Sequence, residues 1–141
     1  FKRVNNFTFG DFMVWRCQLF SWVRLISELE IKEIIQIIEN EEYLENCIFI
    51  SFLRNPLLII KELLPNNKIQ FLNDKVDKDT FSFCVNNKFD IDVQHKALSK
   101  EVVEMFHKEN LQVNCWTVDD PNRAEELVEM GVDYITTNIL E

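Results

Sequence analysis

Residues 113–138 constrain the fold more than any other part of this sequence. They open with an apolar run, 113–118, that predicts a buried strand. Asp120-Pro121 predicts the start of a helix, because aspartate caps helices and proline suits the first helical position. Gly131 predicts the left-handed residue that ends this helix, and 134–137 predicts a second strand. Strand, helix and strand in succession form one βαβ crossover, the unit of parallel sheets.

Earlier apolar runs predict further strands of the same kind. The predicted strands lie at residues 47–52, 68–72, 89–93, 111–118 and 134–137. The predicted helices between them include one that Asn55-Pro56 opens and Pro65 stops, and one at 100–109 that Ser99 caps. This alternation predicts a parallel sheet with right-handed helical crossovers. Five such units amount to part of a (β/α) barrel or to a small open sheet.

The N-terminal 30 residues form an unassigned amphipathic segment, followed by a predicted helix at 31–43. The segment carries a helical stripe, formed by Phe12, Trp15, Leu19, Trp22 and Ile26. Such a stripe packs against a core, or binds a membrane surface or a partner. The run at 12–26 contains two arginines, is too short to cross a bilayer and lacks the features of a signal peptide. We therefore expect no transmembrane helix, no signal peptide and a cytoplasmic location.

Size and composition narrow the class of protein. A chain of 141 residues is expected to form one domain, and it is shorter than a complete (β/α)8 barrel, which typically needs about 250 residues. The formal charge of −9, without a basic cluster, argues against nucleic-acid binding. The four cysteines include no Cys-x-x-Cys pair, so we expect no zinc site and a reducing compartment.

The C-terminal motif is similar to the signature of the glycerophosphodiester phosphodiesterase family. Trp116-Thr117-Val118, Gly131-Val132-Asp133 and Thr137-Asn138 resemble that family's Trp-Thr-Val-Asn strand, its Gly-Val-Asp turn and its final Thr-Asp or Thr-Asn strand. Residues 48–52 resemble its Ile-Ile-Ser-Ser-Phe strand, and the similarity covers about residues 44–141. The resemblance also implies a helix at 79–87, where the alternation of Phe81, Phe83 and Val85 would otherwise favour a strand.

The resemblance implies a TIM-type (β/α) barrel that hydrolyses glycerophosphodiesters to glycerol 3-phosphate and an alcohol, in lipid and glycerol metabolism. It also implies a divalent cation, Mg or Ca, held by carboxylates, and two histidines that move protons. The family's His-Arg, Glu-x-Asp and His-Asp motifs do not occur in this sequence, whose two histidines are His95 and His107. The first strands of the barrel are therefore expected to be missing, and the chain on its own is expected to be truncated, inactive and unable to hold the cation.

Five residues are candidates for the site. By resemblance to a Glu-x-Lys strand, Glu30 is a candidate metal ligand and Lys32 a candidate catalytic residue that contacts phosphate. The same triplet also fits the solvated face of a helix. Trp116, Ser51 and Thr137 are candidates to line the substrate site, because each falls at the carboxyl end of a predicted strand, where the loops of such sheets gather.

Two functions follow from these observations. In the first, residues 31–141 are the C-terminal part of a phosphodiesterase barrel that takes a small-molecule phosphodiester. In the second, the chain is a non-catalytic half-barrel that associates with itself or with a partner, because uncovered strand edges and apolar faces invite pairing.

Overall fold

The computed structural model describes residues 2–5, 17–18 and 27–138. The five longer strands are β3 (Ile48–Ser51), β4 (Lys68–Asn73), β5 (Asp90–Gln94), β6 (Val113–Trp116) and β7 (Tyr134–Thr137). The helices are α1 (Glu28–Asn40), α2 (Arg54–Leu63), α3 (Lys78–Asn87), α4 (Lys100–Lys108) and α5 (Pro121–Met130), with short 3-10 turns η1 (Leu44–Asn46) and η2 (His95–Ala97). No helix in these ranges is both long enough and apolar enough to span a membrane.

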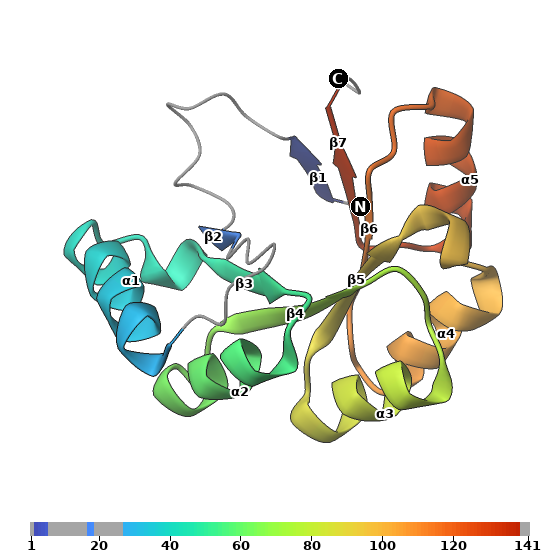
Figure 1. The fold of residues 1–141 in the computed structure, drawn as a ribbon. Coiled ribbons are helices and arrows are strands. Elements are labelled where there is room, and N and C mark those ends of the chain that lie inside the picture. The colour runs from blue at the N-terminus through green and yellow to red at the C-terminus, as the bar shows by residue number, and fades with distance from the viewer. Residues whose placement is uncertain (1, 6–16, 19–26, 139–141) are drawn as a thin grey trace.

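The strands form one parallel sheet that curls into a half-barrel. Its order is β1-β7-β6-β5-β4-β3-β2, and every neighbouring pair is parallel. Helices α2 to α5 connect successive strands and lie along the outside of the curve (Figure 1). The predicted partial TIM-type barrel with about five βα units is confirmed.

Two short strands come from the N-terminal segment that the sequence left unassigned. β1 (Lys2–Asn5) pairs with β7, and β2 (Cys17–Gln18) pairs with β3, so both edges of the sheet come from this segment. A parallel sheet accepts such additions because each edge presents unpaired backbone groups. The predicted helical stripe from Phe12 to Ile26 lies outside the described residues.

Local capping decides where two helices begin. α1 starts at Glu28, three residues before the predicted start, because Ser27 and Glu30 form a reciprocal capping box. Asp77 caps α3 by accepting a hydrogen bond from the backbone N–H of Thr80. This bond, with those of the Thr80 side chain and of Lys75, lowers the pKa of Asp77 to about 2. Residues 79–87 are therefore helical.

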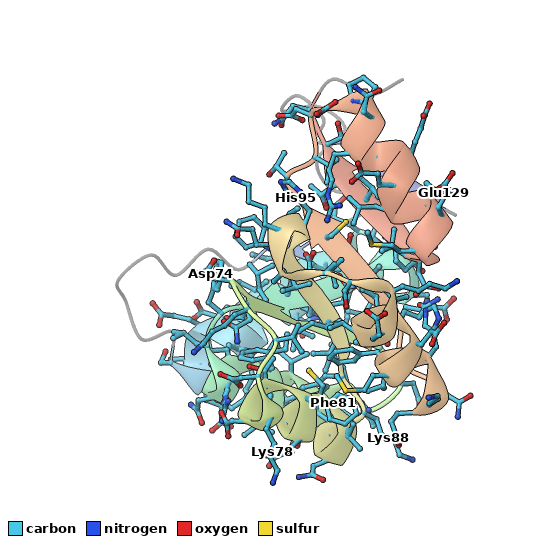
Figure 2. The ribbon with its side chains drawn as sticks, turned by 90° about the vertical axis from the view of Figure 1, so that its right-hand side faces the viewer. Asp74, Lys78, Phe81, Lys88, His95 and Glu129 are labelled. Atoms are coloured by element: carbon cyan, nitrogen blue, oxygen red, sulfur yellow. The ribbon has the colours of Figure 1, made fainter. Side chains whose placement is uncertain are left out.

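The apparent strand pattern of α3 comes from aromatic packing on two sides of the helix. Phe81 lies on α3 (Figure 2). Its ring meets that of Phe106 of α4, with 5.2 Å between ring centroids. Phe83 meets Phe71 of β4 at 5.0 Å and Phe89 at 5.6 Å. Edge-to-face contacts of this kind stabilise aromatic clusters. The alternation of Phe81, Phe83 and Val85 along the sequence thus results from a broad apolar face of the helix.

Side chains alternate between two environments along each strand. Those directed at the helices join the main apolar core: Phe49, Ile69, Phe71, Ile91, Val93, Val113, Cys115 and Ile135. Their neighbours on the concave side of the sheet are largely polar: Gln70, Asp92, Asn114 and Thr136, with Ile50, Leu72 and Tyr134. The helix side of the sheet therefore forms the apolar core, and the concave side presents most of the buried polar side chains of the strands.

Gly131 ends α5 in the left-handed conformation, with φ of +91°. A Cβ at this position would come no nearer than 4.0 Å to Val103, so space does not exclude a side chain. The backbone conformation is the constraint, because L residues are strained there.

We expect Gly131→Ala to lower the free energy of unfolding by about 1–2 kcal/mol, the cost of the left-handed conformation for a residue with a Cβ. Gly131→Asn should cost less, because asparagine tolerates this conformation better. Urea unfolding measures both. Glu129→Ala, at an exposed position of the same helix (Figure 2), is the control and should change stability by less than about 0.5 kcal/mol. Equal losses at positions 129 and 131 would contradict the conformational explanation.

Candidate functional site

The loops after β3 to β6 and the end of β7 lie at the carboxyl edge of the sheet. In parallel sheets this edge is where binding and catalytic groups gather. Two of its residues, Asp74 after β4 and His95 after β5, lie in the upper left part of Figure 2, and Lys88, which precedes β5, lies at the lower right.

Trp116 ends β6 at this edge. Its ring meets that of Phe52 edge to face, with 5.9 Å between centroids. Its indole N–H donates to the backbone carbonyl of Asp92 at 3.3 Å. Phe52 directly follows β3, and β4 and β5 lie between β3 and β6, so the contact spans the curl of the sheet. Phe52 is 46% exposed, which leaves an aromatic surface at the mouth of the half-barrel.

Ser51 and Thr137 lie at strand ends on this edge, as expected, but both are almost fully buried. Their side chains follow the alternation of Phe49 and Ile135, which places them on the helix side of the sheet. The Ser51 hydroxyl accepts the backbone N–H of Leu53 at 3.0 Å, and the Thr137 hydroxyl donates to Asp119 at 3.3 Å. The structure thus brings them to the rim of the site and holds them there by hydrogen bonds.

Asp119 joins the loop after β6 to the end of β7. Its carboxylate accepts the backbone N–H of Asn138 at 2.8 Å and the side-chain amide of Asn138 at 2.9 Å. These bonds, with the one from Thr137, lower the pKa of Asp119. The next residue, Asp120, caps α5. The two adjacent aspartates therefore have different structural roles.

The two histidines lie at opposite ends of the sheet. His95 Nδ1 accepts from Arg123 Nε at 3.4 Å, and the His95 carbonyl accepts from Arg123 Nη2 at 2.6 Å. Burial lowers the pKa of His95, and the nearby Arg123 and Lys96 lower it further, so the ring is neutral at pH 7. His107 contacts Asp133 at 2.9 Å near the amino ends of β6 and β7, away from the candidate site.

Glu30 and Lys32 lie in the first turns of α1, not in a strand. The Glu30 carboxylate accepts from the backbone N–H of Ser27 at 2.8 Å and from the Ser27 hydroxyl at 2.7 Å. The Lys32 ammonium pairs with Glu28 at 2.6 Å on the exposed side of the helix. The structure favours the helical alternative for this triplet and does not bring it together with Trp116. Within residues 2–5, 17–18 and 27–138 there is no cluster of three side chains suited to holding a metal ion.

Arg54 at the start of α2 is an edge residue whose partners the sequence did not reveal. It pairs with Asp79 at the start of α3 and lies over the rings of Phe83, at 4.6 Å, and Phe71, at 5.5 Å. The contact with Asp79 raises the pKa of the guanidinium. An arginine directly after an apolar strand was the available signal, but nothing in its spacing identified Asp79 as the partner.

The concave face contains two layers of polar side chains, one at the amino ends of the strands and one above it. At the amino end, Lys68 Nζ donates to Gln112 at 2.6 Å and to the Tyr134 hydroxyl at 3.2 Å. One layer higher, Asn114 Nδ2 donates to Gln70 Oε1 at 3.2 Å. TIM barrels usually fill this space with branched apolar side chains. The polar filling therefore marks this face as a candidate binding surface.

The fold defines the chain as part of a TIM-type barrel, and the candidate site lies at the carboxyl ends of its strands. The model of the glycerophosphoryl diester phosphodiesterase family matches residues 25–141, and the chain belongs to that family. A glycerophosphodiester phosphodiesterase of Arabidopsis thaliana is 31% identical over 48 residues, which are 34% of this chain and 15% of that protein.

Solved structures share the fold. A glycerophosphodiester phosphodiesterase from Parabacteroides distasonis superposes with a TM-score of 0.67 at 24% identity, over 79% of this chain and 47% of that one. A phosphodiesterase of Oleispira antarctica, solved with the product sn-glycerol-3-phosphate, gives 0.70 at 15% identity, over 78% and 45%. A candidate family enzyme from Galdieria sulphuraria gives 0.76 at 23% identity, over 87% and 52%. The chain thus spans about half the length of these structures.

We expect Asp119→Ala to lower the thermal midpoint at neutral pH, because β7 loses its link to the loop after β6. The lowered pKa means that the Asp119 carboxylate stabilises the fold above the unfolded-state value, about 3.9, and that this contribution is lost as the pH falls through the lower folded value. Thermal scans from pH 7 to pH 2 should show the difference between wild type and variant shrinking below about pH 4. Asp74→Ala, at an exposed edge position, is the control. A difference that is constant with pH would contradict this role for the charge.

Proposed function

We propose that this chain is the C-terminal part of a glycerophosphodiester phosphodiesterase, a hydrolase that converts glycerophosphodiesters to glycerol 3-phosphate and an alcohol. The observation that carries the proposal is the family match over residues 25–141, on a chain whose parallel strands bring Trp116 to the carboxyl edge of a half-barrel. In this proposal, the substrate is a small phosphodiester that contacts Trp116, with Ser51 and Thr137 supporting the rim.

We further propose that the chain on its own does not catalyse the reaction. A divalent cation, Mg or Ca, is implied by the family and would neutralise the phosphate oxygens. The described residues do not fit this ion: Glu30 is engaged in capping α1, and Asp119 is bonded to Asn138. Of the two histidines, His95 is held by Arg123, and His107 lies at the opposite end of the sheet. A cation site would need ligands beyond these.

A second function has support from the topology. The sheet is open, with β1 and β2 as its edges, and strand edges pair readily with other chains. In this alternative the chain is a non-catalytic half-barrel that self-associates or binds a partner. A single monomeric species in size-exclusion chromatography with light scattering would contradict self-association.

We expect no detectable hydrolysis of glycerophosphocholine by this chain with Mg or Ca, because the groups that would hold the cation and move protons are not assembled. Release of glycerol 3-phosphate, followed by an enzyme-coupled assay, measures this. Robust turnover that Glu30→Ala abolishes would overturn the expectation and identify Glu30 as a metal ligand. Lys61→Ala, on the outside of α2, is the matched surface control.

A further inference from the structure

Two buried amides meet on the concave face of the sheet. Gln70 comes from β4 and Asn114 from β6, and β5 runs between them. Both residues have no exposed surface. Their contact, from Asn114 Nδ2 to Gln70 Oε1 at 3.2 Å, bridges the face above β5. The two side chains thus form one unit across three strands.

This contact uses one of the two polar atoms of each side chain. Gln70 Nε2 and Asn114 Oδ1 are buried and have no hydrogen-bond partner among the described residues. Reversing both amide groups would leave the same balance, one N–H donor on one residue and one carbonyl acceptor on the other. Buried polar groups are almost always paired, because an unpaired one costs free energy. The pair is therefore a donor and an acceptor available for one further group.

The position of the pair connects it with the candidate site. Asn114 precedes Trp116 by two residues on β6, so both side chains are on the concave face, one layer apart. The indole of Trp116 is anchored on the backbone of Asp92, the residue paired with Asn114 across the ladder. The Gln70–Asn114 pair therefore lies directly below the aromatic mouth formed by Phe52 and Trp116.

The chemistry of the pair selects the kind of ligand. A hydroxyl group accepts from Gln70 Nε2 through its oxygen and donates its proton to Asn114 Oδ1. An anion would meet the acceptor Asn114 Oδ1, and a cation would meet the N–H of Gln70. A neutral hydroxyl is a small group that satisfies both atoms.

We propose that Gln70 and Asn114 bind a hydroxyl group of a neutral polyol moiety that enters past Trp116, and that they are specificity residues for the glycerol part of the substrate. The assignment to substrate rests on the proposed function. The hydroxyl-binding pair itself rests only on the two amides and their surroundings.

The test is a titration of the 15N-labelled full chain with glycerol, sn-glycerol 3-phosphate and inorganic phosphate, followed by NMR. The side-chain amide signals of Gln70 and Asn114 and the indole signal of Trp116 report on the two layers. We expect glycerol and sn-glycerol 3-phosphate to shift the two amide signals and the Trp116 indole signal, and inorganic phosphate to leave the two amide signals in place.

The variant Gln70→Met/Asn114→Leu removes both amides at similar volume. Because it removes both partners together, it should keep the fold, which the spectrum reports directly. We expect its affinity for glycerol, read from the Trp116 indole, to fall at least tenfold. Asn87→Leu, an amide of α3 on the helix side of the sheet, is the matched control and should bind as wild type.

Two results would overturn the inference. One is a glycerol-induced shift of the Trp116 indole signal that persists in the double variant. The other is that neither glycerol nor sn-glycerol 3-phosphate shifts the amide signals of Gln70 and Asn114, as expected if the pair binds only a buried water. If glycerol fails to shift the amides but sn-glycerol 3-phosphate still shifts the Trp116 indole, the proposed function stands without this pair. If glycerol shifts the amides and sn-glycerol 3-phosphate gives no shift of the indole, the hydroxyl-binding pair stands and its link to the substrate is lost.

Discussion

The period of two along the parallel strands is the constraint on which the rest of the structure depends. Each strand places one set of side chains against the helices and the next set on the concave face. The helix-side set is apolar and merges with buried residues of α2 to α5 into a single core. Because the helix-side set forms the core that stabilises the fold, the concave set can include polar side chains, namely Gln70, Asp92 and Asn114. A one-residue shift in the register of any strand would exchange the two environments.

Most of the fold could be predicted because its signals are local. Asp120-Pro121 and Gly131 bound α5 as predicted, and the apolar runs became β3 to β7. The N-terminal strands could not be predicted, because Lys2–Asn5 and Cys17–Gln18 are too short to show a pattern and pair with strands far along the sequence. The start of α1 was misplaced because Ser27 lies outside the apolar stripe that predicted the helix.

The site was less predictable, because its contacts join residues from different strands. Trp116 was identified from its place at a strand end, and the structure adds Phe52 as its neighbour across the curl. Glu30 matched a motif of two residues, yet the spacing of Ile31, Ile35 and Ile38 already favoured the helix in which it lies. The Gln70–Asn114 contact joins residues 44 positions apart, and no periodicity of either strand reveals it.

The contact between Phe52 and Trp116 has a consequence for the shape of the half-barrel. Backbone hydrogen bonds hold neighbouring strands together but leave the sheet free to flatten or to curl more tightly. The two rings connect strands that share no backbone bond, and thus act as a tie across the arc. The width of the opening at the carboxyl edge therefore depends in part on the size of these two aromatic side chains, as well as on the pairing of the strands.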